Sequence, residues 1–437
     1  HKANGIDGAL AYLAKRIKLD PHSEQTDRLA AMVLDLGRIS PLLNRHGDPL
    51  RQAMENRAEA FHRVMSSHVE VVEEPEGGSG RVGILCSHMG QGEAGVLALA
   101  LLDGLRSLEI QCDLICDSSS DTELQRQVEA LASRTVLLPK GIAEAARLVR
   151  SLNLDILVHA DPLHDSDTPS FPLATQRLAP VQVALPSTMT TTGFDTIDHF
   201  IVGEGWLDSA RNPEESFKEQ LVEVGNLGGN YLLDIGSSSD PEEVTRDDLA
   251  LGPDDILFVS AADAGAVTPE VRSTWVELLA SSPGAKLLLL PFTSPYTKEP
   301  QRRSIIPIFE MEAQAKEVDP KRLLILSDVV PTLSDMIPYL TLGDVYLEAF
   351  PCNTPLPATL AAKAGLPVVA LEGDPLRERI TSGFLREQGL GQFIAADLDD
   401  YLAKAGRFAK ERPGVKLGER DTGPLAEAIA ALLPKKG

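Results

Sequence analysis

Short apolar runs alternate with helical patterns twice along this chain, and this alternation limits the possible fold more than any other feature. The first series of runs is RVGILCSH, QCDLICD, RTVLLP, LDILVHAD and VQVALP. The second is DDILFVSAADAG, AKLLLLPF, KRLLILSD, VYLEAFP and LPVVALEG. Continuous apolar runs separated by helices are typical of parallel strands that are covered on both faces. The pattern therefore predicts an α/β protein with two successive doubly wound, Rossmann-like domains.

The segments around these two series complete the predicted organisation. Residues 1–72 have apolar side chains at three- and four-residue spacing, which predicts a helical N-terminal segment. Glu73–Gly80 mixes acidic residues with Gly and Ser and is typical of a linker. We expect the first Rossmann-like domain at 81–235, the second at 250–412, and a helical tail at 413–437 that crosses back. The length of 437 residues fits this division, because it exceeds what one hydrophobic core usually serves.

Composition excludes several classes of partner. The formal charge of -23 argues against a nucleic-acid partner, because nucleic-acid binders need clustered cations to neutralise phosphates. No apolar stretch reaches the eighteen residues that a membrane span requires, and the first residues are not typical of a signal peptide. The four cysteines lie in apolar runs without the spacing of a zinc site. We expect a cytoplasmic protein with no metal, since sparse cysteine fits a reducing compartment.

Histidines and a glycine-rich loop near the strand ends have structural interpretations beside functional ones. The loop HMGQGEAG could cradle phosphate, but it lacks the Gly-x-Gly-x-x-Gly fingerprint and favours a tight turn. His159 is expected to be a satisfied core residue, and His199 to begin a strand. His164 lies in a loop with Asp161, Asp165 and Asp167 that could bind a cation, although acidic loops usually face water.

Two segments resemble one enzyme family. They are RLAPVQVALPSTMTTTGFDTIDHFIVGEGWL, Arg177–Leu207, and GDVYLEAFPCNTPLPATLAAKAGLPVVALEGDPLRERITSGFLREQGL, Gly343–Leu390. Both are similar to segments of glycosyltransferase family forty-one, which contains the protein O-GlcNAc transferases and the bacterial adhesin N-glucosyltransferases. The resemblance implies a GT-B fold, in which two Rossmann-like domains face a cleft, with the acceptor side first and the nucleotide-sugar side second. Architecture alone also fits periplasmic-type binding proteins and epimerases.

The resemblance implies a metal-independent transfer of a hexose or N-acetylhexosamine to a protein side chain. The donor would be a nucleoside-diphosphate sugar, UDP-linked, and no cofactor is needed. A partner or acceptor protein is therefore expected. In this class of fold, backbone N–H groups at a helix start, with hydroxyls or a cation, hold the diphosphate.

Candidate site residues follow the strands, because ligands of open parallel sheets bind beyond the carboxyl ends of the strands. The candidate donor-binding residues are Ser260, Asn353, Thr354, Glu372, Gly373, Arg379, Thr381 and Ser382. The candidate base is His88, and the candidate acceptor or sugar pocket contains Gln91, Thr190, Thr191 and Thr192. The structural alternative makes Asn353 a turn or cap residue and leaves Arg377 and Arg379 exposed to solvent.

The chain also departs from the family at donor-facing positions. Ala266 stands about where the family has a phosphate-binding lysine, and such a charge-assisted contact is worth roughly 1.5–3 kcal/mol when buried. Pro355, Leu356 and Pro357 follow the Asn-bearing turn, where the family has small or hydroxyl-bearing residues. Leu360 falls near the position of the ribose-binding aspartate. These departures favour a second hypothesis, a non-catalytic GT-B protein that binds or stabilises a partner glycosyltransferase or an acceptor protein.

Overall fold

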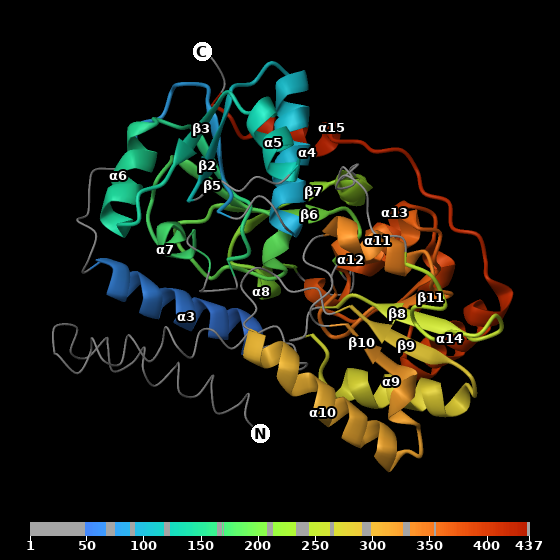
Figure 1. The fold of residues 1–437 in the computed structure, drawn as a ribbon. Helices are drawn as coiled ribbons and strands as arrows, with labels where there is room; N and C mark the ends of the chain where they lie inside the picture. Colours follow the sequence, from blue (N-terminus) through green and yellow to red (C-terminus); the bar gives the residue numbers. More distant parts are fainter. Residues whose placement is uncertain are drawn as a thin grey trace. The chain divides into compact units, whose positions relative to one another are not determined.

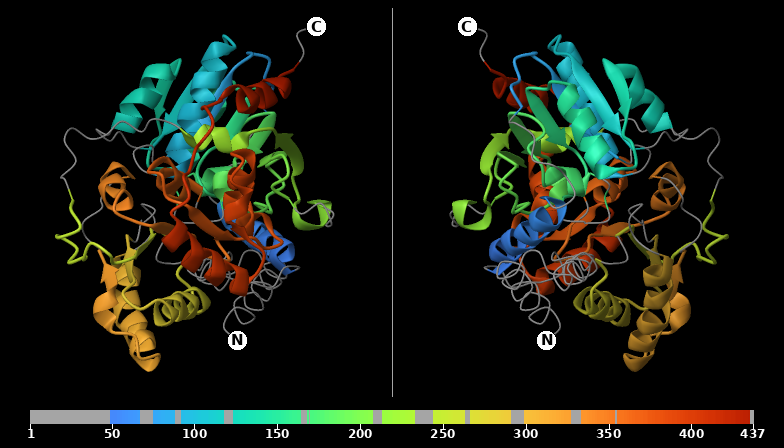
Figure 2. Two further views of the ribbon diagram at one scale, coloured as in Figure 1. Left: turned by 90° about the vertical axis from the view of Figure 1, so that its right-hand side faces the viewer. Right: turned by 90° about the vertical axis from the view of Figure 1, so that its left-hand side faces the viewer.

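The computed structural model shows a chain divided into two compact units (Figure 1; Figure 2). It describes residues 49–66, 75–87, 92–117, 123–163, 168, 170–207, 213–232, 244–262, 266–290, 299–326, 333–353 and 355–434. Unit 1 contains the described residues up to Leu227 together with those from Asp421 onward, and unit 2 contains Gly228–Arg420. Most of the predicted N-terminal helical segment lies outside the described residues.

Unit 1 is built on a parallel sheet whose described strands have the order β3-β2-β1-β4-β5-β6-β7. The strand order reverses between β1 and β4, which pair in parallel. The strands are β1 (Val82–Leu85), β2 (Cys112–Cys116), β3 (Arg134–Leu137), β4 (Ile156–His159), β5 (Val181–Ala184), β6 (His199–Gly203) and β7 (Gln220–Val224). The central strands β1, β2 and β4 are buried along their whole length, as their continuous apolar sequences predict.

Helices cover both faces of this sheet, as Figure 1 shows. On one face, α4 (Glu93–Ser107) packs against α5 (Glu123–Leu131) and α15 (Gly423–Ala431). The other face carries α6 (Ile142–Ser151) and α7 (Phe171–Ala174), whose apolar residues pack on the sheet residues Leu85 and Leu157. The remaining elements of unit 1 are η2 (Pro186–Thr188) and α8 (Pro213–Ser216), while η3 (Leu227–Leu232) lies at the boundary of the units.

The helix α15 returns to unit 1 after the chain has completed unit 2. It lies so close to α4 that a Cβ atom on Gly104 would stand 2.6 Å from the Thr422 carbonyl oxygen and 2.6 Å from the Ala426 Cβ. The absence of a side chain at Gly104 therefore permits this approach. Within the described part of the predicted C-terminal tail, only Gly423–Ala431 is helical and packs in unit 1, whereas residues 413–420 belong to unit 2 and are not helical.

The helix α3 (Pro49–Ser66) is the described part of the predicted N-terminal helices, and it packs onto unit 1. Phe61 meets Phe171 of α7 edge to face, with ring centroids 4.6 Å apart. The Arg57 guanidinium lies 4.8 Å from the centre of the same Phe171 ring. Aromatic and cation–π contacts of this kind each contribute about 0.5–1.5 kcal/mol. The helix is thereby fixed to the loops that follow β4 and β5.

Unit 2 contains a second parallel sheet, with described strands in the order β10-β9-β8-β11-β12-β13. Its strand order reverses between β8 and β11. The strands are β8 (Leu257–Ser260), β9 (Lys286–Leu289), β10 (Leu323–Ile325), β11 (Val345–Leu347), β12 (Val368–Leu371) and β13 (Ile394–Ala395). The predicted doubly wound architecture is therefore confirmed in both units.

The helices of unit 2 form two groups, one on each face of the sheet (Figure 1). One group is α9 (Pro269–Ser281), α10 (Glu299–Ala315) and α14 (Leu398–Glu411). The other is α11 (Leu333–Leu340), α12 (Pro355–Lys363) and α13 (Ile380–Glu387). Short 3₁₀ turns are η4 (Pro320–Arg322), η5 (Leu376–Glu378) and η6 (Gly391–Phe393).

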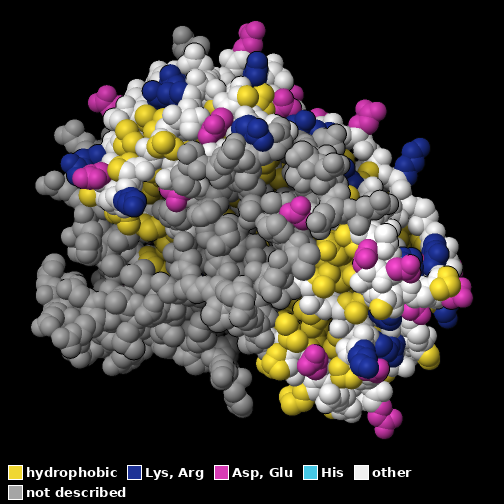
Figure 3. Space-filling view, in the orientation of Figure 1, with side chains coloured by type: hydrophobic (Ala, Val, Ile, Leu, Met, Phe, Trp, Pro, Cys, Tyr) yellow, Lys and Arg dark blue, Asp and Glu magenta, His cyan; other side chains and the backbone are white. Residues whose placement is uncertain are grey.

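Few large apolar side chains face solvent in the described parts of the chain. Two of them, Ile308 and Met311, lie on α10, and Met311 is 63% exposed. Hydrophobic side chains are visible over this part of unit 2 in Figure 3. None of the described helices is both long enough and apolar enough to cross a bilayer.

Candidate functional site

The carboxyl ends of β8 and β11 in unit 2 form a point where the strand order reverses. In open parallel sheets, ligands bind beside such a point, because the connecting loops diverge there and leave a crevice. Ser260 ends β8, and the segment from Glu348 to Asn353 follows β11. The geometry of this edge therefore decides what unit 2 can bind.

Three of the predicted donor-binding side chains are fully buried in unit 2 and keep a polar atom without a hydrogen-bond partner among the described residues. These atoms are Ser260 Oγ, Asn353 Oδ1 and Ser382 Oγ. Asn353 is otherwise well anchored, since its Nδ2 donates to the Ala349 carbonyl at 3.1 Å and its backbone N–H to the Arg377 carbonyl at 2.9 Å. A buried polar atom without a partner costs about 1–3 kcal/mol. These atoms are therefore suited to a polar ligand.

Glu348 is a buried carboxylate at this edge that the sequence analysis missed. Its Oε1 accepts from the backbone N–H of Ala349 at 3.1 Å, and its Oε2 accepts from Thr381 Oγ1 at 3.3 Å. Its backbone carbonyl accepts from the Tyr401 hydroxyl, which in turn accepts from Trp275 Nε1. The only sequence signal was an acidic residue inside the apolar run VYLEAF. Because Thr381 is in the first turn of α13, the start of that helix already faces an anion.

The start of α12 is a poor anion site for a reason that its sequence makes plain. Pro355 and Pro357 are the first and third residues of the helix. Proline has no backbone N–H, so two of the donors that a helix N-terminus usually offers are missing. The remaining side chains of the helix up to Ala362, including Leu356 and Leu360, are buried. Thr354 lies outside the described residues.

Glu372, Gly373 and Arg379 form a local network after β12. Arg379 Nη1 donates to the Gly373 carbonyl at 3.2 Å, and Arg379 Nη2 lies 3.5 Å from Glu372 Oε1. Arg386 Nη2 lies 2.6 Å from the same carboxylate oxygen. The two cations are therefore partly neutralised by Glu372. A side chain on Gly373 would collide with Glu378, which explains the glycine there.

Arg377 differs from the expectation that it faces solvent. Its side chain is only 1% exposed, and Nη2 lies 3.6 Å from Glu378 Oε1. Burial lowers the pKa of Arg377, and the charges of Glu378 and Cys352 oppose that shift. A buried guanidinium beside Asn353 was not predicted, because an arginine in a turn usually reaches water.

In unit 1, the threonines predicted to line a pocket are engaged inside the protein. Thr191 Oγ1 donates to Glu219 Oε2 at 2.7 Å, and the Thr192 hydroxyl donates to Glu219 Oε1. The Thr192 backbone N–H also donates to Glu219 Oε1 at 2.8 Å. Thr190 is likewise buried. The hydroxyls of Thr191 and Thr192 thus fix the turn after β5, while His88 and Gln91 lie outside the described residues.

The carboxyl ends of β1 and β4 form the corresponding reversal point of unit 1. The backbone N–H of Ser87 donates to Asp161 Oδ2 at 2.8 Å, and Ser187 Oγ donates to the Ala160 carbonyl at 2.6 Å. His159 is fully buried, and burial lowers its pKa to about 3. Its two ring nitrogens have no hydrogen-bond partner among the described residues, in contrast to the expected satisfied histidine.

The sequence left a cation site open at the acidic loop that contains His164. Within the described ranges, no group of three or more His, Cys, Asp or Glu side chains could hold a metal ion. His164, Asp165 and Asp167 lie outside those ranges. All four cysteines are buried and none of them forms a disulfide, and burial together with nearby acidic residues raises the pKa of Cys116 to about 11. A thiol of that kind is a weak nucleophile at neutral pH.

The sequence is similar to that of known protein glycosyltransferases. Residues 238–417 match the family model for Glycosyl transferase family 41. The chain is 26% identical over 259 residues to the probable UDP-N-acetylglucosamine–peptide N-acetylglucosaminyltransferase SPINDLY of Arabidopsis thaliana, covering 59% of this chain and 26% of the relative. It is 24% identical over 312 residues to the SEC protein of the same plant, described in the same terms, covering 70% and 30%. The chain thus spans between a quarter and a third of the length of these relatives.

Solved structures show the same fold. An O-GlcNAc transferase variant from Thermobaculum terrenum superposes with a TM-score of 0.69 at 20% identity, covering 98% of this chain and 81% of that one. The sucrose-phosphate synthase of Thermosynechococcus elongatus gives a TM-score of 0.51 at 13% identity, covering 81% and 94%. The fold is that of the GT-B glycosyltransferases. Residues 238–417 are thus similar in sequence to glycosyltransferase family 41, and the chain shares the fold of the solved O-GlcNAc transferase.

Proposed function

We propose that this chain transfers a hexose or N-acetylhexosamine from a nucleoside-diphosphate sugar to a protein side chain, without a metal ion. The names of the similar plant proteins support UDP as the nucleotide and a peptide as the acceptor. The observation that carries the proposal is the group of buried polar atoms of Ser260, Asn353 and Ser382 in a unit whose strand order reverses at β8 and β11. Such a group supports recognition of a polar ligand at the carboxyl edge of that sheet.

The proposed roles follow from this placement. The donor would be held by Asn353 with Ser260 and Ser382, while Thr354, Glu372, Gly373, Arg379 and Thr381 complete the donor side. His88 is the proposed base that takes the acceptor proton, and Gln91 with Thr190, Thr191 and Thr192 is the proposed surrounding of the acceptor. An inverting transfer needs such a base and also donors that stabilise the departing diphosphate. The cytoplasm is the proposed compartment, because the four cysteines form no disulfide, which fits a reducing compartment.

The first test is calorimetric titration of the protein with UDP, GDP and their sugar conjugates. Asn353→Ala removes a buried amide, so UDP affinity should fall by about fivefold or more, roughly the contribution of one hydrogen bond. Asn56→Ala, on α3 of unit 1, is the matched control and should bind UDP as the unaltered protein does. Equal affinity of the Asn353 variant would remove that residue from the donor site.

A second function is favoured by one observation, the loss of N–H donors at the start of α12. Pro355 and Pro357 remove two backbone donors there, and the Thr381 hydroxyl at the start of α13 already donates to Glu348, so the described residues offer a diphosphate fewer donors at these two helix starts. The corresponding candidate is a non-catalytic protein that binds a partner glycosyltransferase or an acceptor protein. If none of the nucleotides or sugar conjugates binds, the transferase proposal fails and this candidate takes its place.

A further inference from the structure

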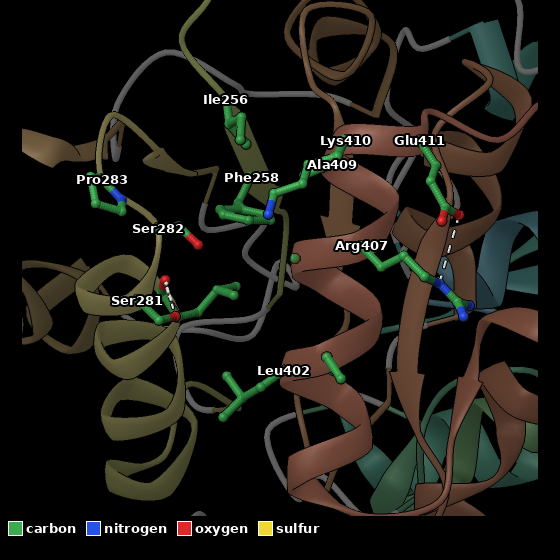
Figure 4. A pocket seen from close by; sticks show the side chains of 13 residues that line it. Ile256, Phe258, Ser281, Ser282, Pro283, Leu402, Arg407, Ala409, Lys410 and Glu411 are labelled. Carbon is green, nitrogen blue, oxygen red and sulfur yellow. Dashed lines mark hydrogen bonds and ion pairs between the residues drawn. The ribbon is translucent and has the colours of Figure 1, made fainter.

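A cavity of about 530 Å³ lies at the amino-terminal edge of the sheet of unit 2 (Figure 4). Asn353 lies at the opposite edge, because it follows the carboxyl end of β11. Its walls come from the start of β8, the C-terminal end of α9 and one face of α14. Ile256, Leu278, Ser282, Leu402, Gly406 and Lys410 are among the residues that line it. Small-molecule sites have volumes of about 300–1,000 Å³, so this space is large enough for a ligand.

The face of α14 that lines the cavity changes from apolar to cationic along its length. Leu402, Gly406 and Lys410 are spaced four residues apart, so they follow one another on the same side of the helix. In Figure 4, Leu402 lies at one end of the cavity and Lys410 at the other, with Ser282 of the α9 end across from the helix. The cavity is therefore a slot with Leu402 at one end and, at the other, Lys410 beside the apolar side chains of Phe258 and Ile256.

Gly406 opens the middle of this slot, and packing does not explain it. Apart from proline, glycine is the poorest helix former, and Gly406 lies inside a helix of 14 residues. A Cβ atom at Gly406 would meet no atom of the described chain within 4 Å. A larger residue would thus be tolerated and would favour the helix. Because Gly406 has no side chain, the space between Leu402 and Lys410 stays open.

The charges around the slot leave one cation for a ligand. Arg407 and Glu411 also line the cavity, and they pair with each other at 3.7 Å. The carbonyl oxygens of Leu279 and Ser282 at the end of α9 both accept from Arg322 Nη2 at 2.7 Å. Lys410 has no ion pair or hydrogen bond with any described residue. A ligand that fits an ammonium group beside an apolar slot is an anion that carries an apolar chain.

We propose that this slot binds a small carboxylate with an apolar chain. The carboxylate would lie between Lys410 and the Ser282 hydroxyl, and the chain would pass Gly406 toward Leu402 and Leu278. Because the slot is at the opposite edge of the sheet from Asn353, this binding is separate from the proposed donor site. The proposal therefore stands whether or not the chain is a transferase.

Octanoate, 1-octanol and octylammonium, titrated calorimetrically into the full chain below their micellar concentrations, test the proposal. Octanoate should bind most tightly, octanol more weakly, and octylammonium weakest. Gly406→Leu fills the slot and should reduce octanoate affinity at least tenfold. Lys410→Met should reduce octanoate affinity about threefold to tenfold and leave octanol unchanged. Lys416→Met, a change at an exposed lysine outside the slot, should leave both affinities unchanged.

The thermal unfolding midpoint separates loss of binding from loss of structure. Gly406→Leu should unfold at or above the temperature of the unaltered protein, because leucine is the better helix former. Unchanged octanoate affinity in a folded Gly406→Leu protein would overturn the proposal, and so would equal affinities for octanoate and octylammonium. Absence of octanoate binding to the unaltered protein would overturn it as well.

Discussion

His159 illustrates how one buried side chain can connect the stability of the chain to pH. It ends β4 in the middle of the unit 1 sheet, where it pairs with Leu85 on one side and Ala184 on the other. Burial lowers the pKa of His159 to about 3, so the folded protein keeps a neutral imidazole at this position. Between pH 6.5 and pH 3 the proton therefore binds preferentially to the unfolded chain.

Acid should therefore destabilise the protein through His159. The folded pKa of about 3 is below the ordinary value of 6.5, so the unfolded chain binds the proton first as pH falls. The stability is fully present above pH 6.5 and is lost progressively between pH 6.5 and pH 3. At pH 5 the loss is about 2 kcal/mol relative to neutral pH, from 1.36 kcal/mol per pKa unit.

Urea unfolding at pH 7.5 and pH 5 measures this effect. His159→Gln should lose about 2 kcal/mol less between the two pH values than the unaltered protein, whatever its absolute stability. The unaltered protein, unfolded in parallel at both pH values, is the reference. His199 contributes in the same direction as His159, because burial also lowers the pKa of His199. An undiminished acid loss in His159→Gln would contradict the assignment.

The threonines after β5 show what the sequence could not reveal at this scale. The hydroxyl-rich turn TMTTTG was correctly placed after a strand, and its position favoured contact with a ligand. The carboxylate that holds its hydroxyls belongs to Glu219, which is 27 positions from Thr192 and 28 from Thr191. A partner at that separation leaves no local signal. Glu348 was not predicted for the same reason, because the Thr381 hydroxyl that donates to it lies 33 residues away in the sequence.

At the scale of elements, the strands with continuous apolar sequences were the predictable ones. The five runs named for each series all contain a strand. β7 was missed because Gln220 and Glu223 interrupt its apolar residues, and the strand is only partly buried at the edge of the sheet. β13 was missed because it has only two residues. The start of α12 was predicted to bind the donor phosphates, but its two prolines lack two of the backbone N–H groups that this role requires.

Two glycines inside helices should respond oppositely to the same substitution. In α14, Gly406→Ala meets no atom of the described chain within 4 Å and should stabilise the protein by about 0.5–1 kcal/mol. In α4, Gly104→Ala would place Cβ 2.6 Å from the Thr422 carbonyl oxygen. The resulting displacement costs about 1–3 kcal/mol, which outweighs the gain in helix propensity.

Chemical denaturation of the two variants in parallel tests the pair, with each serving as the control for the other. Stabilisation by Gly104→Ala would show that α15 does not approach α4 as closely as described. Destabilisation by Gly406→Ala would show that its position is constrained by packing after all.

At the scale of the whole molecule, unit 2 is an insertion within unit 1. The chain enters unit 2 at Gly228 and leaves it at Arg420, so two covalent connections join the units. The doubly wound fold was predictable because each apolar run in the sequence corresponds to one strand. The return of α15 was anticipated only as a tail that crosses back, because no local pattern says which face a short helix will cover.

Removal of everything after Arg420 should therefore damage unit 1 and spare unit 2. Without α15, the apolar surface of α4 loses its cover, and the backbone amides of α4 should exchange with deuterium faster. Amides of β8 and β12 should keep their exchange rates, which provides the control within the same experiment. Equal acceleration in both units would show that the two units unfold together.

The late position of α15 in the chain also affects how unit 1 is completed during synthesis. The helix α4 ends at Ser107, whereas α15 begins at Gly423, more than three hundred residues later. At about 5–20 residues per second, a ribosome needs roughly 15–60 seconds to cover that interval. Throughout this time the apolar side of α4 has been made but its covering helix has not. All of unit 2 must therefore be synthesised before α15 can cover the apolar side of α4 and complete unit 1.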